Sequence, residues 1–186
     1  MTSIVIPNGV TSISKNTFYG CLSLTSIAIP NSVTSIGDNA LYGCGGLTSI
    51  VIPNNVTSIG SSAFSRCGLT EVYCLAENVP STNDKAFYGS AIKSATLYVP
   101  QLSVDVYSET SPWSKFGTII GLTQDEIDGI EEIKDDSLTP ALSKGEGEWY
   151  DLSGRKTNSL PSGRSVGGHI NIVRHSDGTT RKVMVK

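Results

Sequence analysis

A pattern that could support nucleophilic catalysis lies near the end of the chain, where Gly163, Ser165 and Gly167 follow the spacing Gly-x-Ser-x-Gly. This spacing is typical of a nucleophile elbow, whose serine needs a histidine base, and His169 and His175 lie downstream. An elbow also needs a tight strand-to-helix turn, whereas these residues lie in a Gly/Ser-rich stretch before an expected hairpin. We interpret the segment as a loop, predict no catalytic residues, and keep a hydrolase using Ser165 as a remote alternative.

The cysteines recur at a fixed spacing: Cys21, Cys44 and Cys67 are 23 residues apart, and Cys74 follows. In a stack of parallel rungs, neighbouring Cα atoms would be close enough for a disulfide, but side chains that point the same way suit S–S geometry poorly. A zinc site is weakly supported, because there is no Cys-x-x-Cys pair and both histidines lie far along the chain. We predict buried thiols that fill a turn, with no metal and no cofactor.

Two pairs of carboxylates, Glu131/Glu132 and Asp135/Asp136, could serve a glycosidase only if they faced each other across a cleft. They lie in an acidic run that has little aromatic content and no clear core period. We interpret this run, residues 123–147, as a solvated linker that could begin with a helical turn.

Composition limits the classes of function. The chain has 186 residues, of which 38% are hydrophobic and 17% charged, so it can bury a core and keep a polar surface. Its net charge of −3 argues against binding to nucleic acid or to an anionic lipid surface, since both need clustered lysine and arginine. No apolar run reaches the ~18 residues of a membrane helix, so we predict no membrane insertion. No signal peptide is found, and Met1 leads straight into the middle of a repeat, which suggests that further sequence preceded it.

The strongest signal is a repeat of 23 residues, because LTSIAIPNSVTSIG at 24–37 returns almost unchanged as LTSIVIPNNVTSIG at 47–60. Such a period lies within the roughly 20–29 residues of leucine-rich repeats, in which each coil supplies a short strand and a compact turn. One apolar position marks four copies: Phe18, Leu41, Phe64 and Phe87.

Each copy predicts one coil of a mainly β solenoid. In LTSIVIP, Ile50 and Ile52 alternate with outward residues, which is the period of a strand with one buried face. Pro53 then ends the strand, because proline has no N–H to donate to a parallel ladder. A second apolar pair, Val56 and Ile59, points back inward before the turn. No coil could bury these groups alone, so we expect one short parallel strand per coil, with coils stacked at ~4.8 Å.

The fourth copy is irregular, because it loses one residue after Cys67 and regains it later. This shift predicts that Val72 takes the place of Ile50 and that Cys74 takes the place of Ile52. Both substitutions would keep the core apolar.

From about residue 96 the 23-residue period ends, while apolar and aromatic residues continue. An open solenoid end exposes core and strand edge, so an atypical last unit is expected to act as a cap. We predict a cap within 96–122, the last part of a solenoid domain at 1–122. It should bury the following side chains: Leu97, Val99, Val104, Tyr107, Trp113, Phe116 and Ile119.

The phrases LTSIVIPNNVTSIGSSAFSRC and LYVP…SVDVY…PWSKF, taken together, resemble the BspA-like leucine-rich repeat family over residues 1–122. The resemblance implies a surface or secreted protein of Gram-negative anaerobes or of protozoan parasites. It also implies an adhesin that binds host proteins or cells and has no catalytic residues. The chain differs from the family in having four repeats and no N-terminal cap.

Residues 148–186 predict a separate C-terminal β tail. Ile170/Ile172 and Val183/Val185 alternate with polar residues on either side of a Ser-Asp-Gly turn, which is the pattern of a hairpin. The stretch resembles the short C-terminal tails of secreted proteins of the same anaerobes, and this resemblance implies sorting to the cell surface. We therefore expect an extracellular or cell-surface location, on the outer membrane of a Gram-negative bacterium.

Ligand-binding candidates come from positions that point outward. Tyrosine gives a large contact area at low entropic cost, although each tyrosine could also only cover its own turn. We expect Tyr73 to be the one large aromatic side chain of a flat strand face, and Ser65 to interrupt a tyrosine column on the turn side. The candidates are Tyr73, Glu71 and Val51 on the strand face, and Tyr19, Tyr42 and Tyr88 on the turn side.

The sequence as a whole predicts a non-catalytic cell-surface or secreted binding module of adhesin type. Its partner would be a protein or glycan of a host or neighbouring cell. The alternative is a passive structural spacer within a larger surface protein. A saturable ligand whose binding depends on the outward columns would distinguish the two.

Overall fold

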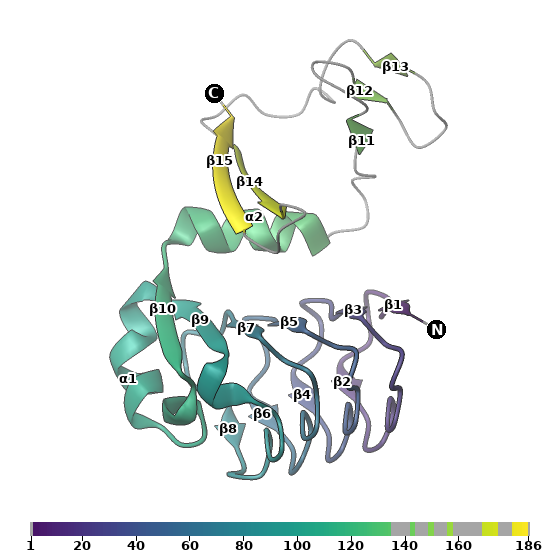
Figure 1. Ribbon diagram of the computed structural model, residues 1–186, viewed down its shortest axis with the longest axis vertical. Helices are drawn as coiled ribbons and strands as arrows, with labels where there is room; N and C mark the ends of the chain where they lie inside the picture. The colour runs from purple at the N-terminus through teal and green to yellow at the C-terminus, as the bar shows by residue number, and fades with distance from the viewer. Residues whose placement is uncertain are drawn as a thin grey trace. The chain divides into compact units, whose positions relative to one another are not determined.

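The computed structural model describes residues 2–134 and five short strands further on, with side chains described as far as residue 130 (Figure 1). The chain divides into two compact units, Met1–Ile127 and Asp128–Lys186. The first unit holds the repeats and the second holds the C-terminal strands.

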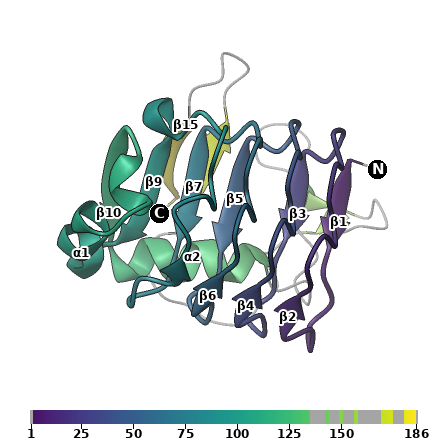
Figure 2. The ribbon, with the colours of Figure 1, turned by 90° about the horizontal axis from the view of Figure 1, so that it is seen from below.

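The first unit carries one short strand per coil along one side, called here the strand face (Figure 2). Its strands are β1 (Ser3–Val5), β3 (Ser26–Ala28), β5 (Ser49–Ile52), β7 (Glu71–Cys74), β9 (Thr96–Pro100) and β10 (Thr118–Leu122). β1 pairs with β3, and β5, β7, β9 and β10 follow one another in a second sheet, with every pair parallel. The predicted mainly β solenoid with a parallel strand in each coil is confirmed.

The register of the fourth coil agrees with the predicted deletion. Val72 pairs with Ile50, and Cys74 pairs with Ile52, across β7 and β5. Val72 and Cys74 are buried, whereas the intervening Tyr73 lies on the outer side. A slip of one residue would have reversed the two faces, so the irregular copy keeps its core residues inside.

Each coil also contains a second, shorter strand. These strands are β2 (Ser12–Ile13), β4 (Ser35–Ile36), β6 (Ser58–Ile59) and β8 (Ser81–Thr82), and they form a parallel sheet in chain order. Ile13, Ile36 and Ile59 are buried, as predicted for the second apolar pair of each repeat. The sequence pattern predicted these buried side chains but not the hydrogen-bonded ladder between them.

The turn after the second strand forms a third ladder between coils. The N–H of Phe18 donates to the carbonyl of Ala40 at 2.7 Å. Equivalent bonds join Leu41 to Ala63 and Phe64 to Ala86. Backbone groups that a tight turn would otherwise leave unpaired are therefore satisfied by the next coil.

The cap extends the strand face by β9 and β10 and covers the end of the core with α1 (Val104–Glu109). It also contains the 3-10 turns η1 (Ile92–Ser94), η2 (Gln101–Ser103) and η3 (Trp113–Lys115). Tyr107 is fully buried, and its hydroxyl donates to the carbonyl of Ala76 at 2.8 Å. Trp113 is also buried and packs edge-on against Phe87, with ring centroids 5.3 Å apart. The apolar residues predicted to fill the cap are all buried or packed against the core.

The helix α2 (Gln124–Lys134) spans the boundary between the two units. It begins with one half of a capping box, in which the carboxylate of Glu126 accepts hydrogen bonds from the N–H and the hydroxyl of Thr123 at 2.9 and 3.0 Å. This helix occupies the start of the segment predicted as an acidic linker. The predicted domain boundaries at 122 and 147 remain predictions.

The described strands of the second unit form two antiparallel sheets. β11 (Leu142–Ser143), β12 (Trp149–Tyr150) and β13 (Lys156–Thr157) form the first sheet. β14 (His169–Arg174) and β15 (Thr180–Val185) form the second, in which Ile172 pairs with Lys182. These two strands lie where the sequence predicted a C-terminal hairpin, and the tail as a separate module stays a prediction.

Gly68 lies where two coils approach closely, because a Cβ atom on it would be 2.3 Å from the carbonyl oxygen of Gly45. That oxygen belongs to the backbone of the neighbouring coil and cannot move away without disturbing it. We predict that Gly68→Ala lowers the free energy of unfolding by about 2 kcal/mol, as measured by urea denaturation.

The matched control is Gly45→Ala, since a Cβ atom there would meet no atom within 4 Å. This variant should change the free energy of unfolding by less than about 0.5 kcal/mol. Equal stability of Gly68→Ala and the parent protein would contradict the close approach.

Candidate functional site

The strand face presents two columns of outward side chains, with one residue from each strand in each column. The first column is Ser3, Ser26, Ser49, Glu71, Thr96 and Thr118, and the second is Val5, Ala28, Val51, Tyr73, Tyr98 and Ile120. Most of these side chains are short, so the face is flat on either side of the two tyrosines. Glu71 is the one charged residue in either column.

Tyr73 and Tyr98, the fourth and fifth residues of the second column, form a stacked pair. Their ring centroids are 4.4 Å apart and their planes differ by 7°. The expectation that Tyr73 is the one large aromatic side chain of this face was therefore wrong. A sequence signal for the second tyrosine exists, because TLYVP at 96–100 repeats the form of SIVIP at 49–53 and places Tyr98 where Val51 stands.

Glu71 contributes charge to this tyrosine pair. Burial raises the pKa of Tyr98, the nearby carboxylate of Glu71 raises it further, and the hydrogen bond with the Tyr73 side chain opposes the shift. Tyr98 is therefore a neutral phenol at physiological pH. The strand face combines two hydroxyl groups, two ring edges and one carboxylate in a small area.

A second set of side chains, called here the turn ridge, consists of the exposed Tyr19, Arg66 and Tyr88 and the half-buried Tyr42. Tyr19 stacks on Tyr42 with ring centroids 4.9 Å apart, and the guanidinium carbon of Arg66 lies 5.8 Å from the Tyr42 ring centre. Tyr88 is 69% exposed. At the corresponding position of the third coil, between Tyr42 and Tyr88, the repeat has Ser65. This serine is buried and its hydroxyl donates to the carbonyl of Lys85, so it interrupts the column of rings.

Arg66 occupies a backbone conformation that the other coils give to glycine. Gly20, Gly43 and Gly89 have φ angles of 71°, 74° and 76°, and Arg66, at the same place in its coil, has a φ of 55°. A left-handed conformation costs a residue with a side chain about 1–2 kcal/mol. An exposed cation is thus retained at a position where the fold favours glycine.

The thiols of Cys44 and Cys67 are buried between coils. Cys44 donates to the carbonyl of Phe18 at 3.2 Å, and Cys67 donates to that of Leu41 at 3.1 Å. Burial, followed by the thiol of the preceding coil, raises the pKa of Cys44 to about 11 and that of Cys67 to about 12. These groups are protonated at physiological pH and act as small core side chains.

Cys74 is also buried, and its sulfur lies 3.2 Å from the hydroxyl of Tyr107. The prediction of buried thiols is confirmed for these three cysteines, whereas Cys21 is only half-buried. Among the residues described, no group of three His, Cys, Asp or Glu side chains is arranged to hold a metal ion.

The remaining sequence candidates lie in the second unit or close to it. Glu131 and Glu132 are on α2, and His169 begins β14, where only the backbone is described. Residues outside the described part are Ser165, His175, Asp135 and Asp136. None of the helices in the described part is both long and apolar enough to cross a membrane.

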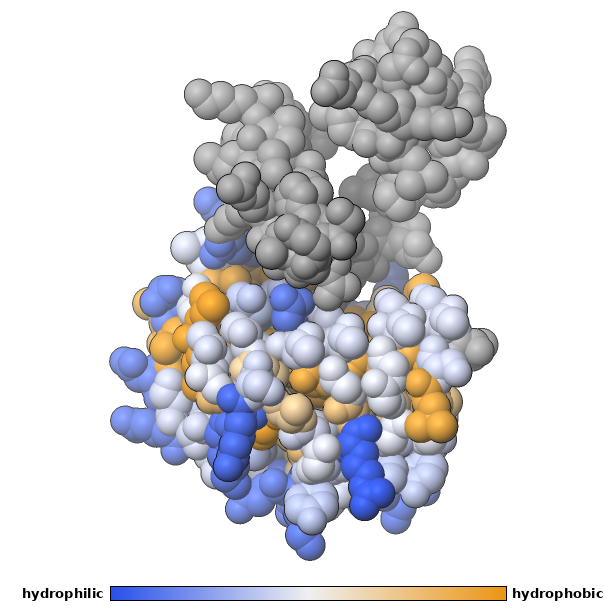
Figure 3. Space-filling view, in the orientation of Figure 1, coloured by the Kyte–Doolittle hydropathy of each residue, from blue (hydrophilic) through white to orange (hydrophobic). Residues whose placement is uncertain are grey.

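Small polar residues dominate the side of the molecule shown in Figure 3, which is mostly pale, with separate strongly hydrophilic and hydrophobic side chains between them. This surface agrees with the Ser, Thr and Asn content of the repeats.

Comparisons with known proteins identify the repeats. The family model of the BspA type leucine rich repeat region matches residues 1–110 in six copies. The 23-residue spacing in the sequence indicated four copies, two fewer. A comparison with curated proteins found no match. Among solved structures, a leucine rich cell surface protein from Faecalibacterium prausnitzii A2-165 is similar, with 25% identity and a TM-score of 0.38. The similarity covers 64% of this chain and 37% of that protein, so this chain spans little more than a third of its length.

The conformation of Arg66 leads to a stability prediction. Replacement by glycine relieves a left-handed strain of about 1–2 kcal/mol and loses a ring contact of about 0.5–1 kcal/mol. We expect Arg66→Gly to be as stable as the parent protein or more stable by up to about 1.5 kcal/mol, as measured by urea denaturation. Arg66→Ala keeps the strain and loses the contact, so it should be less stable than the parent. A larger loss of stability in the glycine variant than in the alanine variant would contradict this account.

The buried thiols predict a loss of stability at alkaline pH. Their raised pKa values mean that the folded protein keeps two protons that the unfolded chain releases above its ordinary thiol pKa of 9.0. The free energy of unfolding should be constant below that value and should fall as pH rises toward 11–12. At pH 10 the loss is about 1 kcal/mol for each thiol.

The measurement is urea denaturation at pH 8 and pH 10 for the parent protein and for a Cys44→Ser/Cys67→Ser variant. Serine does not titrate in this range, so the variant should lose about 2 kcal/mol less between the two pH values. The same pH dependence in both proteins would show that the two thiols do not carry the effect.

Proposed function

The chain belongs to the BspA-type leucine-rich repeat family, and from that premise we propose that it is a non-catalytic, adhesin-like module of the cell surface that binds a protein ligand on its strand face. Membership of this family supports the interpretation of the chain as a repeat-based surface module with either a binding or a structural role. The choice of the strand face rests on its outward side chains. The stacked pair of Tyr73 and Tyr98 is the observation that carries the proposal.

The stacking arrangement favours a protein ligand over a sugar on this face. Sugars bind tyrosine through the flat face of the ring, and here each ring covers one face of the other at 4.4 Å. One face of each ring is therefore unavailable to a sugar, while the ring edges and the two hydroxyl groups of the pair lie side by side. Such rigid, amphipathic contact area is typical of the aromatic residues that anchor protein–protein interfaces.

The charge on the strand face indicates the chemistry of the partner. Glu71 is the one charged side chain in the two outward columns, and its carboxylate lies near the hydroxyl of Tyr98. A lysine or arginine of the ligand placed there would pair with the carboxylate of Glu71 and donate hydrogen bonds to the tyrosine hydroxyl groups. Val51 and Ile120 extend the contact as apolar neighbours on either side of the pair.

A structural spacer is the second candidate, because many polar side chains on the surface bind the next coil. Thr25, Thr34 and Thr57 each donate a hydroxyl hydrogen bond to the carbonyl of the residue 23 positions earlier. These bonds serve coil stacking and need no ligand. A spacer, however, gives no account of the tyrosine pair on the outer surface.

We place the module outside the cell, on the outer membrane of a Gram-negative bacterium, with residues 148–186 as the sorting signal. Support for the surface location comes from the family, and the resemblance of the tail to secretion tails supports the sorting role. The sequence predicted a protein or a glycan as the ligand of the module. For the strand face we propose a protein.

The test is the binding of the full chain to an array of extracellular matrix proteins, followed by titration of each hit. A Tyr73→Ala/Tyr98→Ala variant should lose at least about tenfold in affinity, since central aromatic residues are typical hot spots. Glu71→Gln should lose less, about threefold, and its effect should decrease as salt increases.

The control is Tyr19→Ala, which removes an exposed tyrosine of the turn ridge and should leave the affinity unchanged. Thermal denaturation of each variant checks that the chain is folded. Absence of saturable binding by the folded parent protein would favour the spacer. Equal affinity of the double variant and the parent would exclude the strand face as the binding site.

A further inference from the structure

A concave groove lies between the turn of the fourth coil and the cap, away from the strand face. Its volume is about 460 Å³, which is within the range of small-molecule sites. Buried apolar side chains form part of its lining, and exposed charged side chains stand at its edge. The residues used in the argument are Asp84, Phe87, Tyr88, Ile92, Lys93 and Lys115.

We propose that this groove binds an acidic saccharide, that is, a pyranose sugar that carries a carboxylate. The proposal does not depend on the protein ligand of the strand face, because the two sites share no residue. Three observations support it: the free ring of Tyr88, the uneven charge of the groove, and the fixed acceptor at Asp84.

Tyr88 differs from the other tyrosines of the strand face and the turn ridge in having an uncovered ring. Tyr19 stacks on Tyr42, and Tyr73 stacks on Tyr98, whereas Tyr88 makes no ring-to-ring contact within residues 2–130. It is 69% exposed and lines the groove. The apolar C–H face of a sugar can therefore lie on either face of this ring, whereas each ring of a stacked pair has one face covered.

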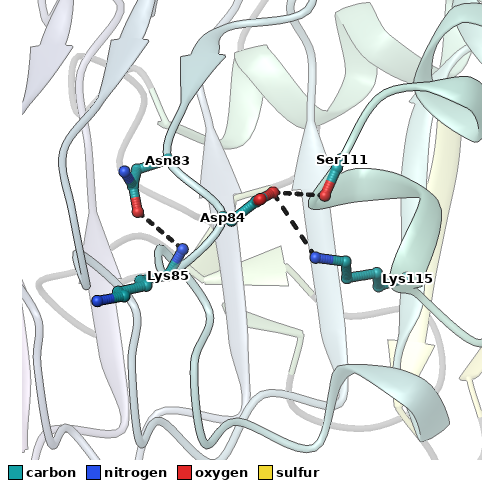
Figure 4. Close-up of polar contacts among 5 residues, drawn as sticks. All are labelled: Asn83, Asp84, Lys85, Ser111 and Lys115. Carbon is teal, nitrogen blue, oxygen red and sulfur yellow. Dashed lines mark hydrogen bonds and ion pairs between the residues drawn. The ribbon is translucent and has the colours of Figure 1, made fainter.

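The charges in the groove leave one cation available. The ammonium of Lys115 lies 3.6 Å from the carboxylate of Asp84, and the hydroxyl of Ser111 donates to the same oxygen (Figure 4). Lys93 is exposed and makes no ion pair with any of the described residues. Although the chain as a whole has a net charge of −3, this lysine is a local positive charge that attracts a ligand carboxylate to the groove.

Asp84 provides a charged acceptor beside that cation. The hydroxyl of Ser111, followed by the ammonium of Lys115, lowers the pKa of Asp84, so the carboxylate is ionised at physiological pH. It is exposed and keeps acceptor capacity beyond these two contacts. A sugar whose ring covers Tyr88 could donate a hydroxyl group to Asp84 while its carboxylate pairs with Lys93.

This combination favours an acidic sugar over other ligands. A nucleotide or phosphopeptide would need several cations around its phosphates, and the groove has Lys93 and an already paired Lys115. A neutral sugar would use Tyr88 and Asp84 but would gain nothing from Lys93. An apolar ligand would leave the charged residues at the edge without compensation.

The experiment is isothermal titration of the full chain with three probes: sialyllactose, an oligomer of galacturonic acid, and lactose as the neutral counterpart. The two acidic probes represent two sources of the same carboxylated-sugar chemistry. We expect at least one of them to bind about threefold or more tighter than lactose, with a preference that decreases as salt increases.

Variants separate the contributions of ring and charge. Tyr88→Ala should reduce the affinity for the acidic probe by about tenfold, while Tyr88→Phe should keep most of it. Lys93→Gln should remove the preference for the acidic probe over lactose. Lys85→Gln is the matched charge control, because Lys85 is exposed on the same coil but does not line the groove, and it should leave binding unchanged.

Several outcomes would overturn the proposal. These are the absence of saturable binding by any probe, equal affinity for sialyllactose, galacturonate and lactose, and equal effects of the Lys85 and Lys93 substitutions. Unchanged affinity in Tyr88→Ala would also overturn it, since a residue that is 69% exposed can be truncated without unfolding the core. The strand-face variants serve as an internal control, because they should bind the saccharide as the parent does.

Discussion

Coil-to-coil hydrogen bonding is the requirement on which the rest of the structure depends. Each coil satisfies its backbone groups on the next coil along the parallel sheets of the strand face, along the sheet of shorter strands and along the turn ladder. Side chains add to this, since Thr34 and Thr57 each bond to the carbonyl 23 residues earlier. Close approach follows, and a Cβ atom on Gly60 or Gly68 would lie within 2.5 Å of the preceding coil. A side chain that faces the neighbouring coil can therefore vary little, which accounts for the near-identity of the repeats.

The features that were predictable from the sequence are those that repeat or that keep the core filled. The register of Val72 and Cys74 followed from counting residues, because only one alignment keeps both side chains inside. The sheet of shorter strands, β2, β4, β6 and β8, was not predictable in the same way. Two-residue strands such as β4 are too short to show an alternating pattern. Tyr98 was missed because a one-residue change in spacing separates its copy from the 23-residue lattice, although the five-residue phrase around it is preserved. Ring stacking and backbone φ angles, which decide what the surface offers, have no simple sequence pattern.

Where coils must match, the residues that depart from the repeat carry the information about function. Glu71 stands where the first three coils have serine, and Arg66 stands where three coils have glycine. Tyr73 replaces a small aliphatic residue on the strand face. All three belong to the part of the solenoid nearest the cap, and the groove that contains Lys93 lies there as well. Stacking alone requires none of these side chains, and Arg66 is present against a conformational preference for glycine. The two proposed binding sites are therefore located in the half of the solenoid that departs most from its own repeat.

The neighbours of each tyrosine, rather than its position in the repeat, determine which ligands it can serve. Tyr42 and Tyr88 occupy the same place in their coils, yet Tyr42 has Tyr19 against its ring and Arg66 within 5.8 Å, whereas Tyr88 has no ring contact within residues 2–130. The cause is the coil between them, where Ser65 is buried and cannot extend the stack. A ring that has lost both faces to neighbours contacts a ligand through its edge and hydroxyl group, which suits a protein surface. A ring with free faces suits a sugar. One serine in the third coil thus separates a structural tyrosine stack from a tyrosine that is available for binding.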